Sequence, residues 1–475
     1  MTGGAAGATA VHCATAVHCA TAVHCATAVV DGVARSDVRL DLDGAGRITA
    51  VTVGVSPRAG DLRLGTVLAG SGNAHSHAFH RVLRGRTHAD GGDFWQWRTA
   101  MYRAAAALDP DTYRQLAVGV FGEMLAAGWT AVGEFHYVHH RPDGSRYDDP
   151  NAVGLAIADA AREVGIRLTL LDTCYLTGAP GQPLAAEQRR FGDGSAAAWL
   201  ERWHALRAAL GDDPLVTVGA AVHSVRAVAP SDVAVIASGL ADDVPLHVHL
   251  SEQPAENEQS LAAYGVRPTR VLADAGALGP RLSVVHATHL TDDEIVQLGN
   301  AGVSAVICPT TEADLGDGIG PAGRLADAGA TIALGSDQNA VVDPFLEVRG
   351  LEAGERLHAR QRGVFSPREL DAARSTAGYR ALGVTGGIGV GAVCDLVEID
   401  SATVRTIGAR PEQLLLTATA SDVLRVVVAG RVVADRGVLV DGRSPAALLH
   451  DAIDVIHVIG AAGPTESAST NGPRA

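Results

Sequence analysis

Short apolar runs alternate with stretches rich in Ala, Leu and Arg through the middle of this chain. The runs have the length of buried strands, whereas the stretches at 151–164 and 196–210 have the spacing of helices. The candidate strands are 66–74, 129–136, 167–174, 215–222, 244–249, 282–286, 302–308 and 331–336. Strand–helix units repeated in this way predict an α/β fold with a TIM-like (β/α)8 barrel over residues 66–384.

A doubly wound open sheet is the alternative arrangement for alternating strands and helices. Such a sheet often carries a G-x-G-x-x-G turn after an early strand, and this chain has none in that position. The pattern therefore favours the barrel.

The two ends of the chain have a different pattern of apolar and polar residues. Residues 28–65 and 385–445 contain short alternating segments separated by Gly-containing turns, which indicate antiparallel strands. We therefore expect a small β-sandwich domain built from both termini. The last stretch, 460–475, is rich in Gly, Pro, Ser and Thr and is expected to be a flexible tail.

Residues 8–25 are three copies of Ala-Thr-Ala-Val-His-Cys. A period of six matches neither a helix nor a strand, so we expect residues 1–27 to be a low-complexity extension without fixed structure. The three His-Cys pairs leave a second interpretation open, in which the extension binds a soft metal.

The composition excludes several classes of function. A net charge of −15 argues against general binding to nucleic acid or to an anionic membrane. No window of about 18 uninterrupted apolar residues indicates a membrane span. The six Cys form no disulfide-like framework, and no Lys or Arg precedes Arg35 as a signal peptide would require. We expect a cytoplasmic protein.

Polar residues gather where the predicted barrel strands end, which is where such barrels carry their chemistry. His75 and His77 are two apart on one strand, so both imidazoles face the same side and can bind one metal ion. Taken alone, each strand-end His is more often a hydrogen-bonded core residue. Six strands, however, end in this way: His75-Ser-His77, Glu134-Phe-His136-Tyr137, His223-Ser-Val-Arg226, His247-Val-His249-Leu-Ser-Glu252, His286-Ala-Thr-His289 and Gly335-Ser-Asp337-Gln-Asn339.

This pattern resembles the amidohydrolase superfamily, with H-x-H on the first strand, His on the fifth and sixth, and Asp on the eighth. The resemblance to this superfamily also includes the β domain made from both termini. The fourth strand ends in His223, without a Lys or Glu there to bridge two metals. The resemblance therefore implies a mononuclear site of the deaminase type.

Within that superfamily the chain is similar to the N-formimidoyl-L-glutamate deiminases of histidine degradation, in order and register from about residue 28 to 440. The motifs that carry this likeness are Asn73-Ala-His-Ser-His-Ala-Phe79, Asp93-Phe-Trp-Gln-Trp-Arg-Thr-Ala-Met-Tyr102, Gly133-Glu-Phe-His-Tyr137, His223-Ser-Val-Arg226, His249-Leu-Ser-Glu-Gln253 and Gly335-Ser-Asp-Gln-Asn339. One position departs from the family, because His80 stands where Gln is expected.

The resemblance implies roles for these residues. One Zn²⁺ per chain would be held by four ligands: His75, His77, His249 and Asp337. Glu252 would protonate the departing nitrogen, Asp337 or His286 would accept a proton from water, and His286 would also stabilise developing negative charge. The residues implied in binding a small dicarboxylate substrate are Arg98, Tyr137, His223, Arg226 and His80. A homodimer is expected, because superfamily members are commonly dimers.

Two other functions remain open. A related mononuclear deaminase could act on a nucleobase or a triazine, but only 4% of residues are aromatic and two well-placed Arg favour an acidic aliphatic substrate. A non-catalytic amidohydrolase-like scaffold would be expected to lose metal ligands, whereas this chain has the full set. His136, His247 and His289 are interpreted as supporting or structural residues.

Overall fold

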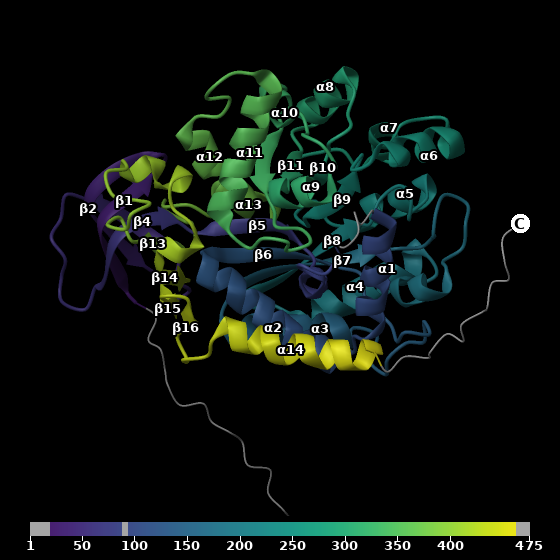
Figure 1. The fold of residues 1–475 in the computed structure, drawn as a ribbon, viewed down its shortest axis with the longest axis horizontal. Helices are drawn as coiled ribbons and strands as arrows, with labels where there is room; N and C mark the ends of the chain where they lie inside the picture. The colour runs from purple at the N-terminus through teal and green to yellow at the C-terminus, as the bar shows by residue number, and fades with distance from the viewer. Residues whose placement is uncertain (1–19, 88–93, 462–475) are drawn as a thin grey trace, which may run out of the picture.

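The computed structural model describes residues 20–87 and 94–461, which contain two eight-stranded sheets. One sheet is wholly parallel, and its strands follow one another in chain order (Figure 1). Its strands are β5 (Ser71–Ser76), β6 (Trp129–His136), β7 (Arg167–Cys174), β8 (Val216–Val222), β9 (Leu246–Leu250), β10 (Leu282–His286), β11 (Ser304–Ile307) and β12 (Thr331–Leu334).

The first and last of these strands meet at their carboxyl ends. The backbone N–H of Ser336 donates to the carbonyl of His75 at 3.0 Å, and that of His77 donates to the carbonyl of Asp337 at 2.8 Å. These bonds join the end of β5 to the segment after β12. The predicted (β/α)8 barrel is thereby confirmed.

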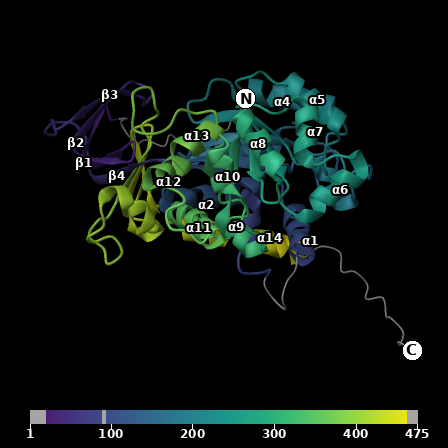
Figure 2. The same ribbon diagram turned by 90° about the horizontal axis from the view of Figure 1, so that it is seen from above.

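Helices cover the outside of the barrel (Figures 1 and 2). They are α1 (Phe94–Ala106), α2 (Pro110–Ala127), α3 (Ala152–Val164), α4 (Ala196–Leu210), α5 (Pro230–Gly239), α6 (Pro254–Tyr264), α7 (Pro268–Asp274), α8 (Asp292–Ala301), α9 (Pro309–Leu315), α10 (Ala322–Asp327), α11 (Pro344–Ala359), α12 (Pro367–Arg374) and α13 (Thr376–Ala381).

The helices expected at 151–164 and 196–210 are confirmed as α3 and α4. The Ser195 hydroxyl caps the start of α4 by accepting from the Ala198 backbone N–H, and Gly165 ends α3 in a left-handed conformation. A further helix, α14 (Pro445–Ala461), was not predicted and lies along α2 (Figure 1). Among the described residues, no helix has the length and apolar character needed to cross a bilayer.

The second sheet combines strands from both ends of the chain, as expected. Its order is β16-β15-β14-β13-β4-β1-β2-β3, so β4 lies between a strand from each terminus. Its amino-terminal strands are β1 (Ala22–Val30), β2 (Val33–Leu42), β3 (Ile48–Val53) and β4 (Leu62–Ala69). Its carboxyl-terminal strands are β13 (Leu396–Ile399), β14 (Val423–Val428), β15 (Arg431–Asp435) and β16 (Val438–Leu439).

The expected boundary of the amino-terminal extension was wrong. Strand β1 begins at Ala22, inside the last copy of the six-residue repeat, and Cys25 is fully buried there. The repeat period does not prevent this, because β1 pairs with β2 on one side and with β4 on the other. Residues 1–19, and residues 462–475 of the expected tail, lie outside the described residues.

The expected first barrel strand at 66–74 is in fact two strands. Residues 66–69 belong to β4 of the mixed sheet, and the barrel begins with β5. The chain passes from one sheet to the other at Gly70, where an added Cβ would lie 2.3 Å from the Thr130 hydroxyl. Only glycine fits this close crossing, which an apolar run alone does not reveal.

Candidate metal centre and adjoining cavity

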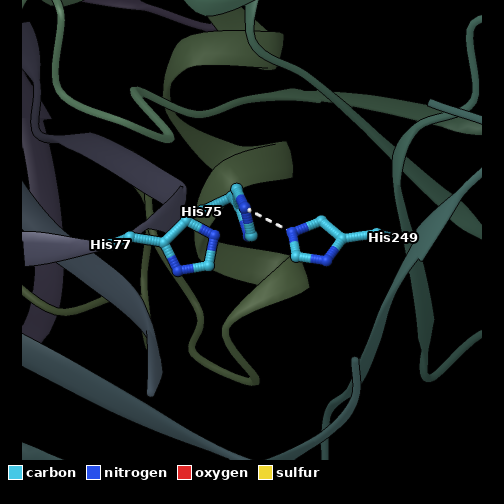
Figure 3. Close-up of side chains that lie close together, drawn as sticks. All are labelled: His75, His77 and His249. Atoms are coloured by element: carbon cyan, nitrogen blue, oxygen red, sulfur yellow. Dashed lines mark hydrogen bonds between the residues drawn. The ribbon is translucent and has the colours of Figure 1, made fainter. Parts of the chain in front are cut away.

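Three histidines from two barrel strands turn their ring nitrogens toward one another (Figure 3). The Nε2 atoms of His249 and His75 are 3.1 Å apart. Asp337 approaches from the end of β12, with Oδ1 at 3.4 Å from His75 Nε2 and 3.5 Å from His77 Nε2. The residues expected to hold a metal are therefore gathered at one point.

Backbone carbonyls fix the ring tautomers of two of these histidines. His77 Nδ1 donates to the carbonyl of Phe135 at 2.9 Å, and His249 Nδ1 donates to the carbonyl of His223 at 2.9 Å. A carbonyl only accepts, so the proton sits on Nδ1 and the Nε2 lone pair of each ring faces the centre. Burial lowers the pKa of His77 to about 3, which keeps the imidazole neutral.

This donor set suits a divalent cation. Neutral imidazole nitrogens and one carboxylate oxygen are the ligands that zinc prefers, and the rings of His77 and His249 are held by hydrogen bonds from their other nitrogen. All four residues are at most 5% exposed. Without a cation, the Nε2 lone pair of His77 would face the Asp337 carboxylate in a buried space, and such a contact between two acceptors is unfavourable.

A network of short polar side chains holds the H-x-H segment against the end of β12. Asn73 donates to the Ser336 hydroxyl at 2.6 Å, and Ser336 in turn donates to the side-chain oxygen of Asn339 at 2.7 Å. The Asn339 amide then donates to the carbonyl of His77 at 3.0 Å. The network fixes the distance between the first and last strands, and so between the ligands that they carry.

The backbone is strained at the ends of these strands. His286 has a φ of +68° and Asp337 a φ of +43°, both in the left-handed region that non-glycine residues seldom occupy. Such strain persists only where the surrounding structure enforces it, and it is concentrated at functional sites. Here the strained residues are His286 and Asp337 themselves, which bring an imidazole and a carboxylate together.

His286 lies among carboxylates. Its Nε2 is 3.7 Å from Asp337 Oδ2 and 4.0 Å from Glu252 Oε1, while its Nδ1 is 3.3 Å from Glu312 Oε1. Burial lowers the pKa of His286, but Glu252, Glu312 and Asp337 outweigh burial and raise this pKa to about 10. The three residues with expected catalytic roles are therefore neighbours at the edge of the metal centre.

A cavity of about 680 Å³, including its open mouth, extends from this centre. All five residues that were expected to bind substrate line its wall: Arg98, Tyr137, His223, Arg226 and His80. Its wall also includes Glu252, His286 and Asp337. The cavity therefore joins a metal centre to a wall with two guanidinium groups.

The arginines differ in their surroundings. Arg226 lies beside two carboxylates, with a guanidinium nitrogen 3.6 Å from Glu252 Oε2 and Nε 3.9 Å from Glu256 Oε2. Arg98, on α1, donates from Nε to the Tyr102 hydroxyl at 2.8 Å. Arg226 thus lies beside the expected proton donor, and Arg98 lies beside an aromatic side chain of the cavity wall.

His80 contacts the substrate cavity and the metal centre. It is 3% exposed, its Nε2 is 3.0 Å from the Tyr137 hydroxyl, and its ring centroid lies 4.5 Å from that of His77. The departure from the family pattern at this position is therefore located in the cavity wall.

The family model described as the amidohydrolase family matches residues 66–433. The chain belongs to the amidohydrolase family. The match spans the whole barrel and returns into the second sheet, so both parts of the fold are covered.

Among proteins of this family, the chain is 38% identical to the formimidoylglutamate deiminase of Pseudomonas aeruginosa, over 86% of this chain and 93% of that protein. It is 31% identical to the 5-methylthioadenosine/S-adenosylhomocysteine deaminase of Syntrophobacter fumaroxidans, over 77% of this chain and 80% of that protein. Family membership and these relatives make the chain a hydrolase of carbon–nitrogen bonds.

Solved amidohydrolase structures share the fold. An amidohydrolase from Brucella melitensis superposes with a TM-score of 0.85 at 32% identity, covering 92% of this chain and 99% of that one. An adenosine deaminase from Xanthomonas campestris, solved with bound zinc, superposes with a TM-score of 0.79 at 26% identity, covering 93% and 98%.

Sequence reasoning missed several residues of the cavity. Tyr175 directly follows β7, so the rule that strand ends carry the chemistry should have found it. Two residues behind the cavity wall have no signal in the sequence pattern: Glu312, which contacts His286 from α9, and Gln188, which contacts Tyr175 from the 3-10 helix η3 (Ala186–Phe191).

Proposed function

We propose that this amidohydrolase hydrolyses N-formimidoyl-L-glutamate to N-formyl-L-glutamate and ammonia, a step of histidine degradation. The observation that carries the proposal is the cavity in which two arginines face a histidine–aspartate metal centre. The 38% identity to a formimidoylglutamate deiminase supports the choice of substrate.

The metal in this proposal is one Zn²⁺ per chain, held by four ligands: His75, His77, His249 and Asp337. When bound, zinc lowers the pKa of a water molecule toward neutrality and so supplies hydroxide. The residues of the chain provide the rest of the chemistry, namely substrate binding and proton transfer.

The reaction removes both protons from the attacking water, whose oxygen becomes the formyl oxygen, and delivers two protons to the terminal nitrogen. Water adds its oxygen to the formimidoyl carbon, the bond from this carbon to the terminal nitrogen breaks, and that nitrogen leaves as ammonia. Asp337 accepts the protons from water, because the raised pKa of His286 leaves this imidazole already protonated, and Glu252 delivers protons to the leaving nitrogen. His286 also donates a hydrogen bond to the oxygen on which negative charge develops.

The substrate carries two carboxylates, and the arginines are the groups suited to bind them. A guanidinium offers a fork of N–H donors that matches the two oxygens of a carboxylate. We assign this role to Arg98 and Arg226, with further hydrogen bonds from Tyr137, His223 and His80.

The decisive experiment is an assay of ammonia release from N-formimidoyl-L-glutamate by the zinc-loaded protein. The controls are 5-methylthioadenosine, 8-oxoguanine and cytosine, each of which contains a planar base and carries no carboxylate. We expect turnover of formimidoylglutamate alone. Turnover of a nucleobase or nucleoside without turnover of formimidoylglutamate would contradict the proposal and favour the second candidate, a nucleobase deaminase.

Three further expectations belong to this proposal. A metabolic enzyme of this kind would act in the cytoplasm, would bind neither nucleic acid nor membrane, and would form a homodimer. Sedimentation of the purified protein would test the dimer. A zinc-free protein without hydrolase activity would instead support the scaffold interpretation.

A further inference from the structure

One buried glutamine joins two tyrosines of the cavity. Gln188 is 2% exposed, and its amide nitrogen is 3.1 Å from the Tyr102 hydroxyl and 2.9 Å from the Tyr175 hydroxyl. Tyr102 comes from α1 and Tyr175 from the end of β7, so Gln188 links two separate parts of the wall. Both tyrosines line the cavity that contains the metal centre.

The orientation of the Gln188 amide is determined by a third contact. Its side-chain oxygen is 2.9 Å from the backbone nitrogen of Ala185, which can only donate. The oxygen must therefore face Ala185, and the NH₂ group must face the two phenols. Each of the two amide hydrogens then has one phenol oxygen as its acceptor.

This arrangement fixes the role of both hydroxyl groups. An amide nitrogen does not accept, so neither tyrosine can donate back to Gln188. The oxygen of Tyr102 also accepts from Arg98 Nε at 2.8 Å. Within the described part of the chain, no hydrogen bond uses the hydroxyl hydrogen of Tyr102 or Tyr175 as the donor. Both hydrogens are therefore available to a molecule in the cavity.

The charges around these hydroxyls suit an anion. Arg98 and Arg226 line the same cavity, and Arg98 lies over the ring of Tyr102 with its guanidinium carbon 5.4 Å from the ring centroid. Burial and the neighbouring Tyr102 raise the pKa of Tyr175 to about 12, so its hydroxyl keeps its proton at neutral pH. Two arginines and two hydroxyl donors together match a group that only accepts.

We propose that the hydroxyls of Tyr102 and Tyr175, turned toward the cavity by Gln188, form with Arg98 a subsite for one substrate carboxylate. Gln188 is a positioning residue: it touches no substrate and acts through the two phenols. The identity of the ligand rests on the proposed function, whereas the preference for a carboxylate rests on the donor geometry. The subsite requires that Gln188 remain a donor to both phenols.

The main test is Gln188→Glu, which keeps the shape but replaces the donor with an acceptor. The phenol hydrogens would then turn toward the introduced carboxylate and away from the cavity. Because a hydrogen bond to a charged group is worth about 1.5–3 kcal/mol, we expect KM for formimidoylglutamate to rise about 10- to 100-fold, with kcat little changed. Thermal unfolding would verify that the variant is folded.

A matched control separates geometry from charge. Gln259 is exposed and lines a neighbouring cavity that also includes Arg98 and Arg226. Gln259→Glu adds the same charge near the arginines without contacting either phenol. We expect its effect on KM to be much smaller than that of Gln188→Glu, and equal effects would overturn the proposal.

A neutral variant tests whether Gln188 acts through the phenols. Gln188→Met should weaken binding in the wild-type background and have no further effect in a Tyr102→Phe, Tyr175→Phe background, where the hydroxyls are absent. An equal loss in both backgrounds would show a merely structural role and would overturn the proposal. This variant also replaces Gln188→Glu if the latter does not fold.

The subsite can be measured without turnover, which separates its failure from failure of the proposed function. Calorimetry with N-formyl-L-glutamate and with glutarate should show weaker binding to Gln188→Met than to the wild-type protein. If the wild-type protein releases no ammonia from formimidoylglutamate but this difference persists, only the proposed function fails. Unchanged binding of both dicarboxylates would overturn the subsite.

Discussion

Buried polar groups have different partners at the two ends of the barrel. At the amino-terminal end, Arg167 and the Tyr379 hydroxyl donate to Asp395 at 3.0 and 2.6 Å, so a buried carboxylate is fully compensated within the chain. At the carboxyl-terminal end, the Nε2 lone pair of His77 faces the Asp337 carboxylate, and that of His249 faces Nε2 of His75. Polar groups that hydrogen-bond within the chain stabilise the fold, whereas ring nitrogens without a partner in the chain are positioned to bind a ligand.

Two histidines on β9 provide the sharpest test of this difference. His249 contributes to the metal centre, whereas His247 lies deeper in the barrel and pairs with the carbonyl of Ala381 at 2.8 Å. We expect His249→Gln to lose zinc and reduce ammonia release to background, because a ligand is removed. His247→Gln should keep both metal and activity. Metal analysis and kinetics of the two variants would decide, and equal metal loss would contradict the comparison.

The substitution Glu252→Gln is expected to have the next largest effect on activity. Glu252→Gln keeps the size of the side chain but removes the proton that it transfers, so kcat should fall about 10²- to 10⁴-fold while zinc content stays unchanged. Glu258→Gln, an exposed position on α6, is the matched control and should be neutral. A small change in kcat for Glu252→Gln would exclude Glu252 as the proton donor.

At the amino-terminal end of the barrel, we expect a substitution to reduce the stability of the fold without reducing catalytic activity. Asp395→Ala leaves the buried guanidinium of Arg167 without its partner, which should cost about 3–5 kcal/mol of unfolding free energy. In the exposed pair of Arg270 and Asp274, the variant Asp274→Ala should cost about 0–1 kcal/mol. Chemical denaturation would measure both, and kcat per folded molecule should be unchanged.

Arg226 should separate substrate binding from catalysis. Loss of a charge-assisted carboxylate contact in Arg226→Met should raise KM for formimidoylglutamate about 10- to 100-fold. The exposed Arg270→Met serves as the control. An unaltered KM would show that Arg226 does not meet a carboxylate of the substrate.

The smallest effect is expected at the amino terminus. Removing residues 1–19 should leave activity and zinc content unchanged, because the metal centre lies in the barrel. Removing residues 1–27 should impair folding, because it deletes most of β1, a strand paired on both sides. Lost zinc in the shorter deletion would support a metal-binding role for the His-Cys repeat.

The cluster of candidate metal ligands was predictable from the sequence, whereas the details of the cavity were not. His75 and His77 are two residues apart on a strand, and strand ends meet at one face of a barrel, so local spacing and fold class were sufficient. The position of Gln188 depends on how the short helix η3 packs against α1 and the end of β7, which no local pattern encodes. Donor and acceptor roles in such a network follow from tertiary structure alone.

Both errors in the expected boundaries occurred in the mixed sheet. An apolar run around residues 66–74 has no internal mark for a change of sheet except Gly70, and a single glycine in a strand is a weak signal. Strand β1 is stabilised by pairing with β2 and β4, and the repetitive sequence gives no sign of this pairing. Pairing between distant segments decided both cases.

The position of β4 between strands from the two termini also sets an order of assembly. During synthesis, the whole barrel emerges between β4 and its partner β13, in which Leu396 pairs with Ala69. Until β13 has been made, one edge of β4 remains open, and contacts between such distant residues form slowly. The mixed sheet therefore cannot be completed before all strands of the barrel have been synthesised.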